Sequence, residues 1–250
     1  MSKLDRYAVP IFLGVITSAT LLTLWRLTYV TLWSDELRGT ITLIRLPWVD
    51  LLTGHYTWDF NPPLYFLTLK TWILLLGSDT EIVMRMFSVV LWVSSLVALY
   101  FLGKTLANWK VGIILILAIA FHPDFLIYST QLRMYPLLIF FSTLALLFYA
   151  RYTFREVHHW GWLVALGAVL VLAIYTHYSA VFLSLIILMF CLFILIARKD
   201  RRQYLVLGVI LLAWLLTIPL SGIFWQQYQQ VEKISSLSSN LQSLSPAILF

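Results

Sequence analysis

Charged residues and cysteine are both scarce in this sequence, and these two absences exclude several classes of protein. Only 11% of the 250 residues are charged, whereas 61% are hydrophobic. A soluble domain carries about 25% charged residues, so a water-soluble globular fold is excluded. The one cysteine, Cys191, lies inside an apolar run and cannot form a disulfide within the chain. We also find no Gly-rich phosphate loop, no zinc-type Cys/His spacing and no internal repeat.

Long apolar runs dominate what the sequence does contain. A helix rises about 1.5 Å per residue and the hydrocarbon core is about 30 Å thick, so runs of roughly 17–22 residues can cross it. Such runs cover residues 8–27, 82–103, 111–128, 136–150 (a short one), 160–176, 178–197 and 204–222. The sequence therefore predicts an all-α polytopic membrane protein of about seven transmembrane helices. We expect one domain over residues 1–250, with the first span as an uncleaved signal anchor.

One further apolar run, residues 62–77, is too short to cross and has Lys70 at its middle. Its ~14 residues after the prolines would reach about 21 Å as a helix. If this run does not cross, every basic loop falls on the side of Lys3 and Arg6, as the positive-inside rule predicts. These loops contain Lys104 with Lys110, Arg151 with Arg155, and residues 198–203. We therefore expect a cytoplasmic N-terminus in the plasma (inner) membrane, and we attribute the net charge of +6 to topology, not to nucleic acid binding.

The other polar segments then share the extracytoplasmic side. They are the long loop 28–81, the connections 122–135 and 176–179, and the tail 223–250, which would begin a second large outer loop. The Ser/Gln-rich composition of the tail predicts loop or weak helix.

Two amphipathic juxtamembrane helices are expected inside the loop 28–81. Over residues 37–52, apolar residues recur at helical spacing and Pro47 breaks or bends the run. The run 62–77 would form the second helix, lying in the outer interface with Lys70 extending to the lipid headgroups.

Asp35 and Glu36 stand side by side where the first span leaves the lipid. A carboxylate at this place can act as a general base or hold a divalent metal. The alternative is that Ser34 or Asp35 caps the following helix, where the helix dipole favours acid. Asp50 and Asp59 are rival acids in the same loop.

Basic and ring-nitrogen side chains lie at the other outer connections. Arg133 can fork onto a phosphate, or else reach for lipid headgroups. His122 and Asp124 flank Pro123 and are either metal ligands or turn caps.

Two further residues at the outer ends of spans have both a functional and a structural interpretation. His177, in a one-turn break, can bind a phosphate or a metal or relay a proton, although a structural role is the commoner one. Arg85 can pair with Glu81, four residues earlier.

In this order, the pieces "DE" (35–36), "NPPLYFLTLKTWILLLGSDTEIVMRMFSVV" (61–90) and "HPDFLIYSTQLRMYPLLIF" (122–140) resemble a known pattern. The chain is similar to the N-terminal half of the GT-C glycosyltransferases, in the branch of dolichyl-phosphate-mannose protein mannosyltransferases and bacterial aminoarabinose transferases. The resemblance covers roughly residues 8–190. Asn61 departs from it, because aminoarabinose transferases carry a lysine before the two prolines.

The resemblance implies an enzyme that moves a sugar from a polyprenyl-phosphate carrier to an acceptor at the extracytoplasmic face of the bilayer. Asp35 would be the catalytic acid of the first outer loop, supported by Glu36. Arg133 and His177 would contact the carrier phosphate, with Tyr135, Lys70 and Arg85 as further substrate-binding candidates. A divalent metal ion is an open question, with Asp35, His122 and Asp124 as its candidate ligands.

The resemblance also bears on length and on rival functions. Family members are about twice this length, so we expect a missing C-terminal half or a partner subunit. A transporter or flippase, or a non-catalytic membrane scaffold, are the alternatives. Against a transporter, polar residues gather at the outer ends of the spans and not along a path across the membrane.

Overall fold

The computed structural model describes residues 5–54, 56, 59–155 and 159–244, so Lys3 lies outside the described residues. Every regular element in these ranges is a helix. The elements are η1 (Asp5–Tyr7), α1 (Ala8–Arg26), η2 (Glu36–Ile41), α2 (Trp48–Thr53), α3 (Leu64–Leu76), α4 (Glu81–Leu106), α5 (Trp109–Ala120), α6 (Pro123–Tyr128), α7 (Tyr135–Phe154), α8 (Trp160–Thr176), α9 (Ala180–Arg198), α10 (Gln203–Thr217) and α11 (Leu220–Leu244). The protein is therefore an all-α polytopic membrane protein, as the apolar runs predicted.

The number of spans is smaller than predicted when judged by helix length. Four helices, α1, α4, α7 and α9, are long and apolar enough to cross a membrane, and α10 with the first part of α11 makes a fifth if this pair, bent by 54°, is one span. The helices α5 and α8 are apolar but shorter. The predicted count of seven is therefore not confirmed within the described residues.

Two predicted spans are broken by proline. The run 111–128 divides into α5 and α6 because Pro123 has no N–H to continue the helix, and His122 Nδ1 instead accepts a hydrogen bond from the Asp124 N–H (3.3 Å). The run 204–222 breaks near Pro219 between α10 and α11. Most of the tail expected as loop or weak helix belongs to α11, whose bounds are Leu220 and Leu244.

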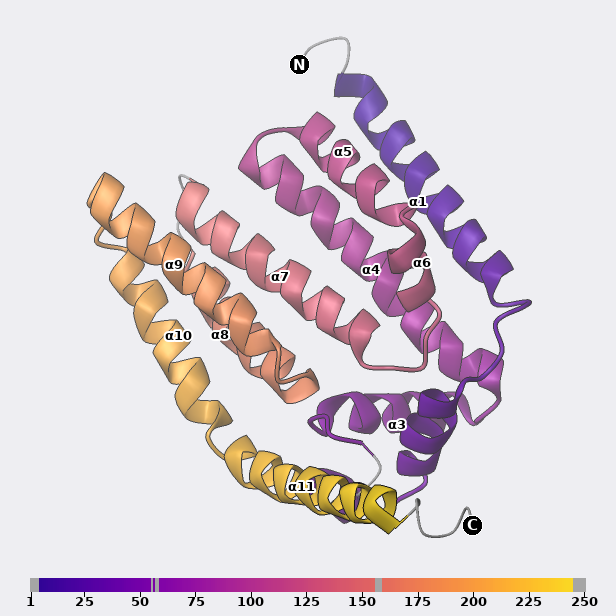
Figure 1. Ribbon diagram of the computed structural model, residues 1–250. Helices are drawn as coiled ribbons and strands as arrows, with labels where there is room; N and C mark the ends of the chain where they lie inside the picture. Colours follow the sequence, from indigo (N-terminus) through magenta and orange to yellow (C-terminus); the bar gives the residue numbers. More distant parts are fainter. Residues whose placement is uncertain (1–4, 55, 57–58, 156–158, 245–250) are drawn as a thin grey trace.

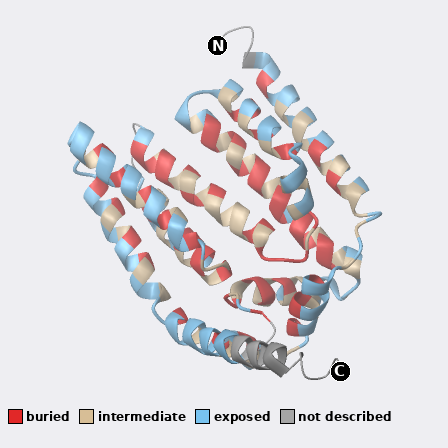
Figure 2. Ribbon diagram, in the orientation of Figure 1, coloured by how far each residue is buried: buried red, intermediate tan, exposed pale blue. Residues whose placement is uncertain are grey.

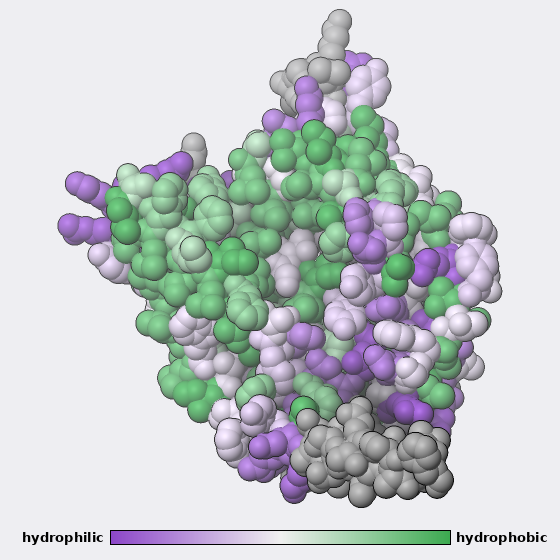
Figure 3. All heavy atoms as spheres, in the orientation of Figure 1, coloured by the Kyte–Doolittle hydropathy of each residue, from purple (hydrophilic) through white to green (hydrophobic). Residues whose placement is uncertain are grey.

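The bundle buries its interior helices and exposes apolar side chains on its flank. Figure 2 shows buried residues along α4 and α7, whereas the outer helix α9 is largely exposed. Exposed residues of α9 include Phe182, Met189, Phe193 and Ile196. Figure 3 shows hydrophobic residues gathered over the upper and left part of the visible face, and hydrophilic residues at the helix tips and in the lower right. An apolar flank of this extent fits contact with lipid.

Most of the outer segments predicted from charge lie toward one end of the bundle. Figure 1 shows the helix α3, the turn between α8 and α9, and α11 in the lower part of the view, to which the chain that leaves α1 also descends. The α4–α5 and α9–α10 connections lie at the opposite end with the N-terminus. The helix α3 lies across the end of the bundle, as expected of a juxtamembrane helix.

A separate core fastens these crosswise elements to the bundle. It joins buried side chains of η2 and the following turn, α2, α3, α4 and the start of α7, among them Leu43, Leu51, Phe66, Leu69 and Leu132. The helix predicted over 37–52 is divided into η2, which ends at Ile41, and α2, which begins after its N-cap residue Pro47. This core holds in place the loops that carry the polar residues at this end of the bundle.

Candidate functional site

The neighbouring acids Asp35 and Glu36 occupy opposite environments. Asp35 is exposed, and the Ser34 hydroxyl lies 3.5 Å from its Oδ1. Glu36, the first residue of the π-helix η2, is fully buried. The side chain of Asp35 does not cap η2, because it makes no hydrogen bond to that helix. Of the two carboxylates, only that of Asp35 can meet a substrate from solution.

Glu36 forms a buried ion pair with Arg85. Its two oxygens accept hydrogen bonds from the guanidinium at 3.1 Å and 2.9 Å, and its Oε1 also accepts the N–H of Leu132 (2.8 Å). Arg85 further donates from Nε to Glu81 (2.7 Å) and from Nη1 to the Thr130 carbonyl (2.6 Å). The pair expected between Glu81 and Arg85 is thus present. The network ties the loop after α1 to α4 and to the segment before α7.

Arg133 is the second buried arginine, and its side chain contacts the loop that carries Asp35. Its Nη1 donates to Asp59 Oδ2 (2.5 Å) and to the backbone carbonyl of Asp35 (3.2 Å). Asn61 donates its amide to the other oxygen of Asp59. Gly39 makes room for the pair, since a Cβ there would lie 2.5 Å from Arg133 Nη1 and 2.8 Å from Asp59 Oδ2. Residues 98 positions apart, an acid and a cation, therefore share one site.

The two buried arginines differ in the donors that they have left. All three nitrogens of Arg85 have partners. Arg133, in contrast, uses Nη1 alone, and within the described ranges neither its Nε nor its Nη2 has a hydrogen-bond partner. An arginine that is held through one nitrogen, and whose other N–H groups are unused, is suited to bind an oxyanion such as phosphate. Arg85 has a structural role, because its hydrogen bonds hold neighbouring segments of the chain together.

His177 and Tyr135 lie next to this arginine. The ring of His177 is 6.2 Å from that of Tyr135, the first residue of α7. His177 Nδ1 accepts hydrogen bonds from the Ser179 N–H (3.1 Å) and contacts its hydroxyl (2.8 Å). Burial lowers the pKa of His177, with Asp59 raising it and Arg133 lowering it by their charges. The imidazole is therefore neutral at pH 7, with Nδ1 as an acceptor.

A small cavity of about 190 Å³ lies beside Tyr135. It is lined by Trp33, Asp124, Ile127, Tyr128, Gln131 and Tyr135. The Oε1 atom of Gln131 is buried and has no hydrogen-bond partner among the described residues. A buried acceptor without a donor costs free energy, so this wall is suited to a ligand that brings a hydroxyl or an amine.

Lys70 is not brought to this site. Its ammonium donates to the Leu46 carbonyl and lies 5.0 Å from the centre of the Trp48 ring. It does not extend to the lipid headgroups as expected, because the Leu46 carbonyl, between η2 and α2, and the face of Trp48 engage the ammonium. Lys70 thus fastens α3 to the outer loop.

The candidate metal ligands do not assemble into a site in the described part of the chain. No three His, Cys, Asp or Glu side chains gather there in a metal-binding arrangement. His122 Nδ1 lies 3.9 Å from Asp124 Oδ2, and both side chains are exposed. His122 acts as the cap of α6. The residues present do not by themselves fit a divalent metal, and no step below is derived through one.

Sequence reasoning named Asp59 only as a rival acid and did not recognise it as the partner of Arg133. It also missed Asn61, which orients Asp59, and Gln227, whose Nε2 donates to the Asn61 carbonyl (3.3 Å). The polar stretch "DFNPP" (59–63) within an otherwise apolar loop is the signal that could have found the first two.

The chain matches a known protein family. The family model described as dolichyl-phosphate-mannose-protein mannosyltransferase matches residues 61–223, a range that contains Arg85, Arg133, Tyr135 and His177 but not Asp35. No curated protein matches in sequence.

A solved structure shares the fold. It is the archaeal oligosaccharyltransferase AglB from Archaeoglobus fulgidus, in complex with an inhibitory peptide and a dolichol-phosphate. The match has a TM-score of 0.63 at 15% identity and covers 99% of this chain and 35% of that one, so the chain spans about a third of that protein's length. By the match of the family model over more than half of its length, the chain belongs to the dolichyl-phosphate-mannose-protein mannosyltransferase family, within the GT-C fold.

Proposed function

We propose that this chain carries the transfer site of a membrane glycosyltransferase that takes a sugar from a polyprenyl-phosphate carrier. One observation carries the proposal: the partly engaged guanidinium of Arg133 donates a hydrogen bond to the backbone carbonyl of Asp35, whose own carboxylate is exposed. A carrier lipid presents its phosphate at that depth of the membrane, where a cation can meet it. Membership of the family supports this chemistry.

The proposed reaction needs a base and an anion-binding group on opposite sides of the sugar. The acceptor oxygen or nitrogen forms a bond to the anomeric carbon while the bond from that carbon to the phosphate oxygen breaks. The Asp35 carboxylate takes the acceptor's proton. The polyprenyl phosphate leaves with the electron pair, and Arg133 stabilises the negative charge that develops on it. His177 and Tyr135 are placed to contact the same phosphate.

Glu36 and Arg85 support this site without touching the substrate in the proposal. Glu36 is buried and its oxygens are occupied, so its role is to position the backbone that precedes it. A divalent cation, if one takes part, would need ligands from the substrate in addition to this chain.

The orientation in the membrane follows from the charge of the two bundle ends. The end opposite the site carries Lys104, Lys110, Arg151, Arg155 and the basic turn 198–202. By the positive-inside rule that end is cytoplasmic, which places Asp35 and the 28–81 loop outside in the plasma (inner) membrane. Reporter fusions after residues 55, 108, 155, 200 and 235 test this arrangement, with the expected result outside, inside, inside, inside and outside.

The decisive experiment measures sugar transfer by the longest available gene product that contains this chain, in proteoliposomes supplied with a panel of polyprenyl-phosphate hexoses and pentoses. We expect turnover to fall about 10²–10⁴-fold in Asp35→Asn, the range for loss of a general base. Asp50→Asn is the matched control, because it removes an acid from α2 in the same loop. Absence of transfer from every donor refutes the function, and wild-type turnover in Asp35→Asn refutes the role of that residue.

A further inference from the structure

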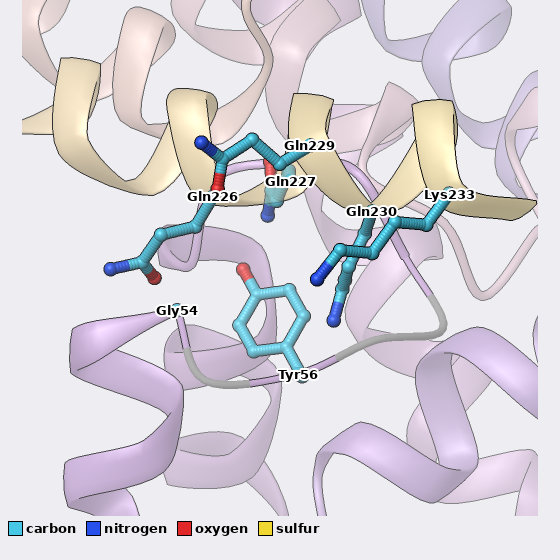
Figure 4. Close-up of a pocket in the computed structure, with 7 residues that line it drawn as sticks. All are labelled: Gly54, Tyr56, Gln226, Gln227, Gln229, Gln230 and Lys233. Atoms are coloured by element: carbon cyan, nitrogen blue, oxygen red, sulfur yellow. The ribbon is translucent and has the colours of Figure 1, made fainter.

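The helix α11 presents a row of glutamine side chains to a cavity that the transfer chemistry does not use. The sequence "QQYQQVEK" places Gln226, Gln229, Gln230 and Lys233 at intervals of three, one and three residues, which is one face of a helix. With Gln227, Gly54 and Tyr56 they line a cavity of about 370 Å³. Figure 4 shows the Tyr56 ring facing the side chains that descend from α11.

A different face of α11 is aromatic. Phe224, Trp225 and Tyr228 are all about half exposed and stack on one another, with ring centres 5.8 Å apart for Trp225 and Tyr228. Aromatic side chains of this kind favour the membrane interface. The helix thus has an aromatic side suited to the bilayer surface and an amide side turned to the cavity.

The cavity is connected to the transfer site through hydrogen bonds at Asn61. The Asn61 carbonyl accepts from the Tyr56 hydroxyl (2.7 Å) and from Gln227 Nε2 (3.3 Å). The side chain of Asn61 contacts Asp59, which in turn holds Arg133. Asn61 therefore holds two lining residues, Tyr56 and Gln227, through its backbone carbonyl and orders the arginine's partner with its side chain.

The far side of Gln227 is also fixed. Its Oε1 accepts a hydrogen bond from the hydroxyl of Tyr178 (2.9 Å), next to His177. Burial raises the pKa of Tyr178 to about 12, so this hydroxyl remains a donor at neutral pH. Gln227 is thus a structural link, whereas Gln226 and Gln229 are exposed and Gln230 is half-buried, so these three amides can meet a ligand.

From this lining we infer that the cavity between α11 and Tyr56 is a binding site for a neutral sugar ring. An amide offers two donors and an acceptor without charge, which matches the paired hydroxyls of a sugar. Tyr56 is only 4% exposed, and its ring packs against Phe66 with 5.8 Å between the ring centres. It therefore closes the inner wall of the cavity, and recognition of the sugar falls to the amides. A site for phosphate would carry cations along the wall, whereas here three ligand-facing amides accompany one lysine.

This inference deepens the proposed function and rests on it for the source of the sugar, which is either the donor's transferred residue or a glycan acceptor. Binding itself can be measured without any transfer. Saturation-transfer NMR on the full chain in detergent micelles, with the methyl glycosides of mannose, glucose, galactose and N-acetylglucosamine, provides the direct test. Methyl glucuronide serves as the anionic comparison.

We expect saturation transfer to at least one neutral glycoside, and about tenfold weaker binding in the double variant Gln226→Leu/Gln230→Leu, since each lost hydrogen bond weakens binding several-fold. Glu232→Leu is the control, because it places leucine on α11 outside the cavity lining. The single variant Gln226→Leu, at an exposed position, is expected to show a several-fold loss with the fold intact.

Several results would overturn the inference. They are the absence of any neutral glycoside signal, equal binding in wild type and the double variant, and tightest binding of the glucuronide. Transfer that persists when the glycoside signal is lost would also refute this site while leaving the proposed function standing. Wild-type binding of a neutral glycoside by a chain that transfers sugar from no donor does the reverse. A raised KM for donor alone, or for acceptor alone, then identifies the source of the sugar.

Discussion

The buried pair of Glu36 and Arg85 yields a prediction with a definite magnitude. In Glu36→Gln the side chain keeps its size but loses its charge, and Arg85, which is only 1% exposed, keeps its own. The remaining carboxylate, Glu81, is 38% exposed and contacts Nε alone. Removing one partner of a buried ion pair costs about 3–5 kcal/mol. We place Glu36→Gln near 3 kcal/mol, because the amide oxygen can still accept the Leu132 N–H.

A reversible unfolding titration in mixed detergent micelles, followed by circular dichroism, measures this cost. The same titration on Glu36→Met/Arg85→Met tests its cause. With both charges replaced by apolar side chains, no buried charge is left unpaired, and such replacements are often neutral or stabilising. We therefore expect the double variant to be more stable than Glu36→Gln. Asp35→Asn, at an exposed neighbouring position, should leave the free energy of unfolding unchanged within about 0.5 kcal/mol.

Two outcomes would contradict the structural role of Glu36. The first is wild-type stability in Glu36→Gln, since the ion pair would then contribute nothing. The second is a Glu36→Gln protein of normal stability that transfers sugar as poorly as Asp35→Asn, which would move Glu36 from the framework into the chemistry.

Three further predictions concern the surroundings of the site. Gly39→Ala should destabilise the fold by about 1–3 kcal/mol and lower transfer by displacing Arg133, because the new Cβ would lie 2.5 Å from its Nη1; a melting curve and a transfer assay together check this. Gly54→Ala should cost about 1–2 kcal/mol, since φ is +70° there and the Cβ would meet Ile223 at 2.5 Å; an unchanged melting curve would contradict it. The pKa of His177 is lower in the fold than its usual 6.5, so its stabilising contribution is full above pH 6.5 and is lost as the pH falls. Unfolding titrations at pH 7.5 and 5.0 should therefore show a weaker pH dependence in His177→Gln than in wild type, and equal dependence would refute this.

The arrangement of the helices was largely predictable from the sequence, since apolar length and loop charge depend on composition alone. The predicted runs 8–27 and 160–176 agree with α1 and α8 to within a residue at each end. The break at Pro219 was not predicted, and the break at Pro123 was predicted only in part, through the possible turn caps His122 and Asp124. Each proline lies within a run whose mean hydropathy stays high. Hydropathy reports the solvent around a helix and not the continuity of its hydrogen bonds.

The partners within the site were much less predictable. Arg133 meets Asp59 across 74 positions of the chain, and no local pattern selects Asp59 over Asp50 for that contact. The adjacent Asp35 and Glu36 suggested a shared role, yet the π-helical turn sends one side chain to solvent and the other into the core. Such choices depend on tertiary packing, which a single sequence reveals only through the polar stretch "DFNPP".

The different uses of the two arginines follow from how many acceptors surround each. Arg85 faces two carboxylates and a carbonyl that together engage all of its nitrogens, so binding a phosphate there would first require breaking buried ion pairs. Arg133 is held by a single carboxylate, and that carboxylate is itself restrained by Asn61. A guanidinium oriented through one nitrogen loses little side-chain freedom when an oxyanion meets the others. Arg85 is therefore neutralised by Glu36 as part of the structure under the loop. Arg133 is restrained but keeps nitrogens that can bind an oxyanion near the exposed Asp35.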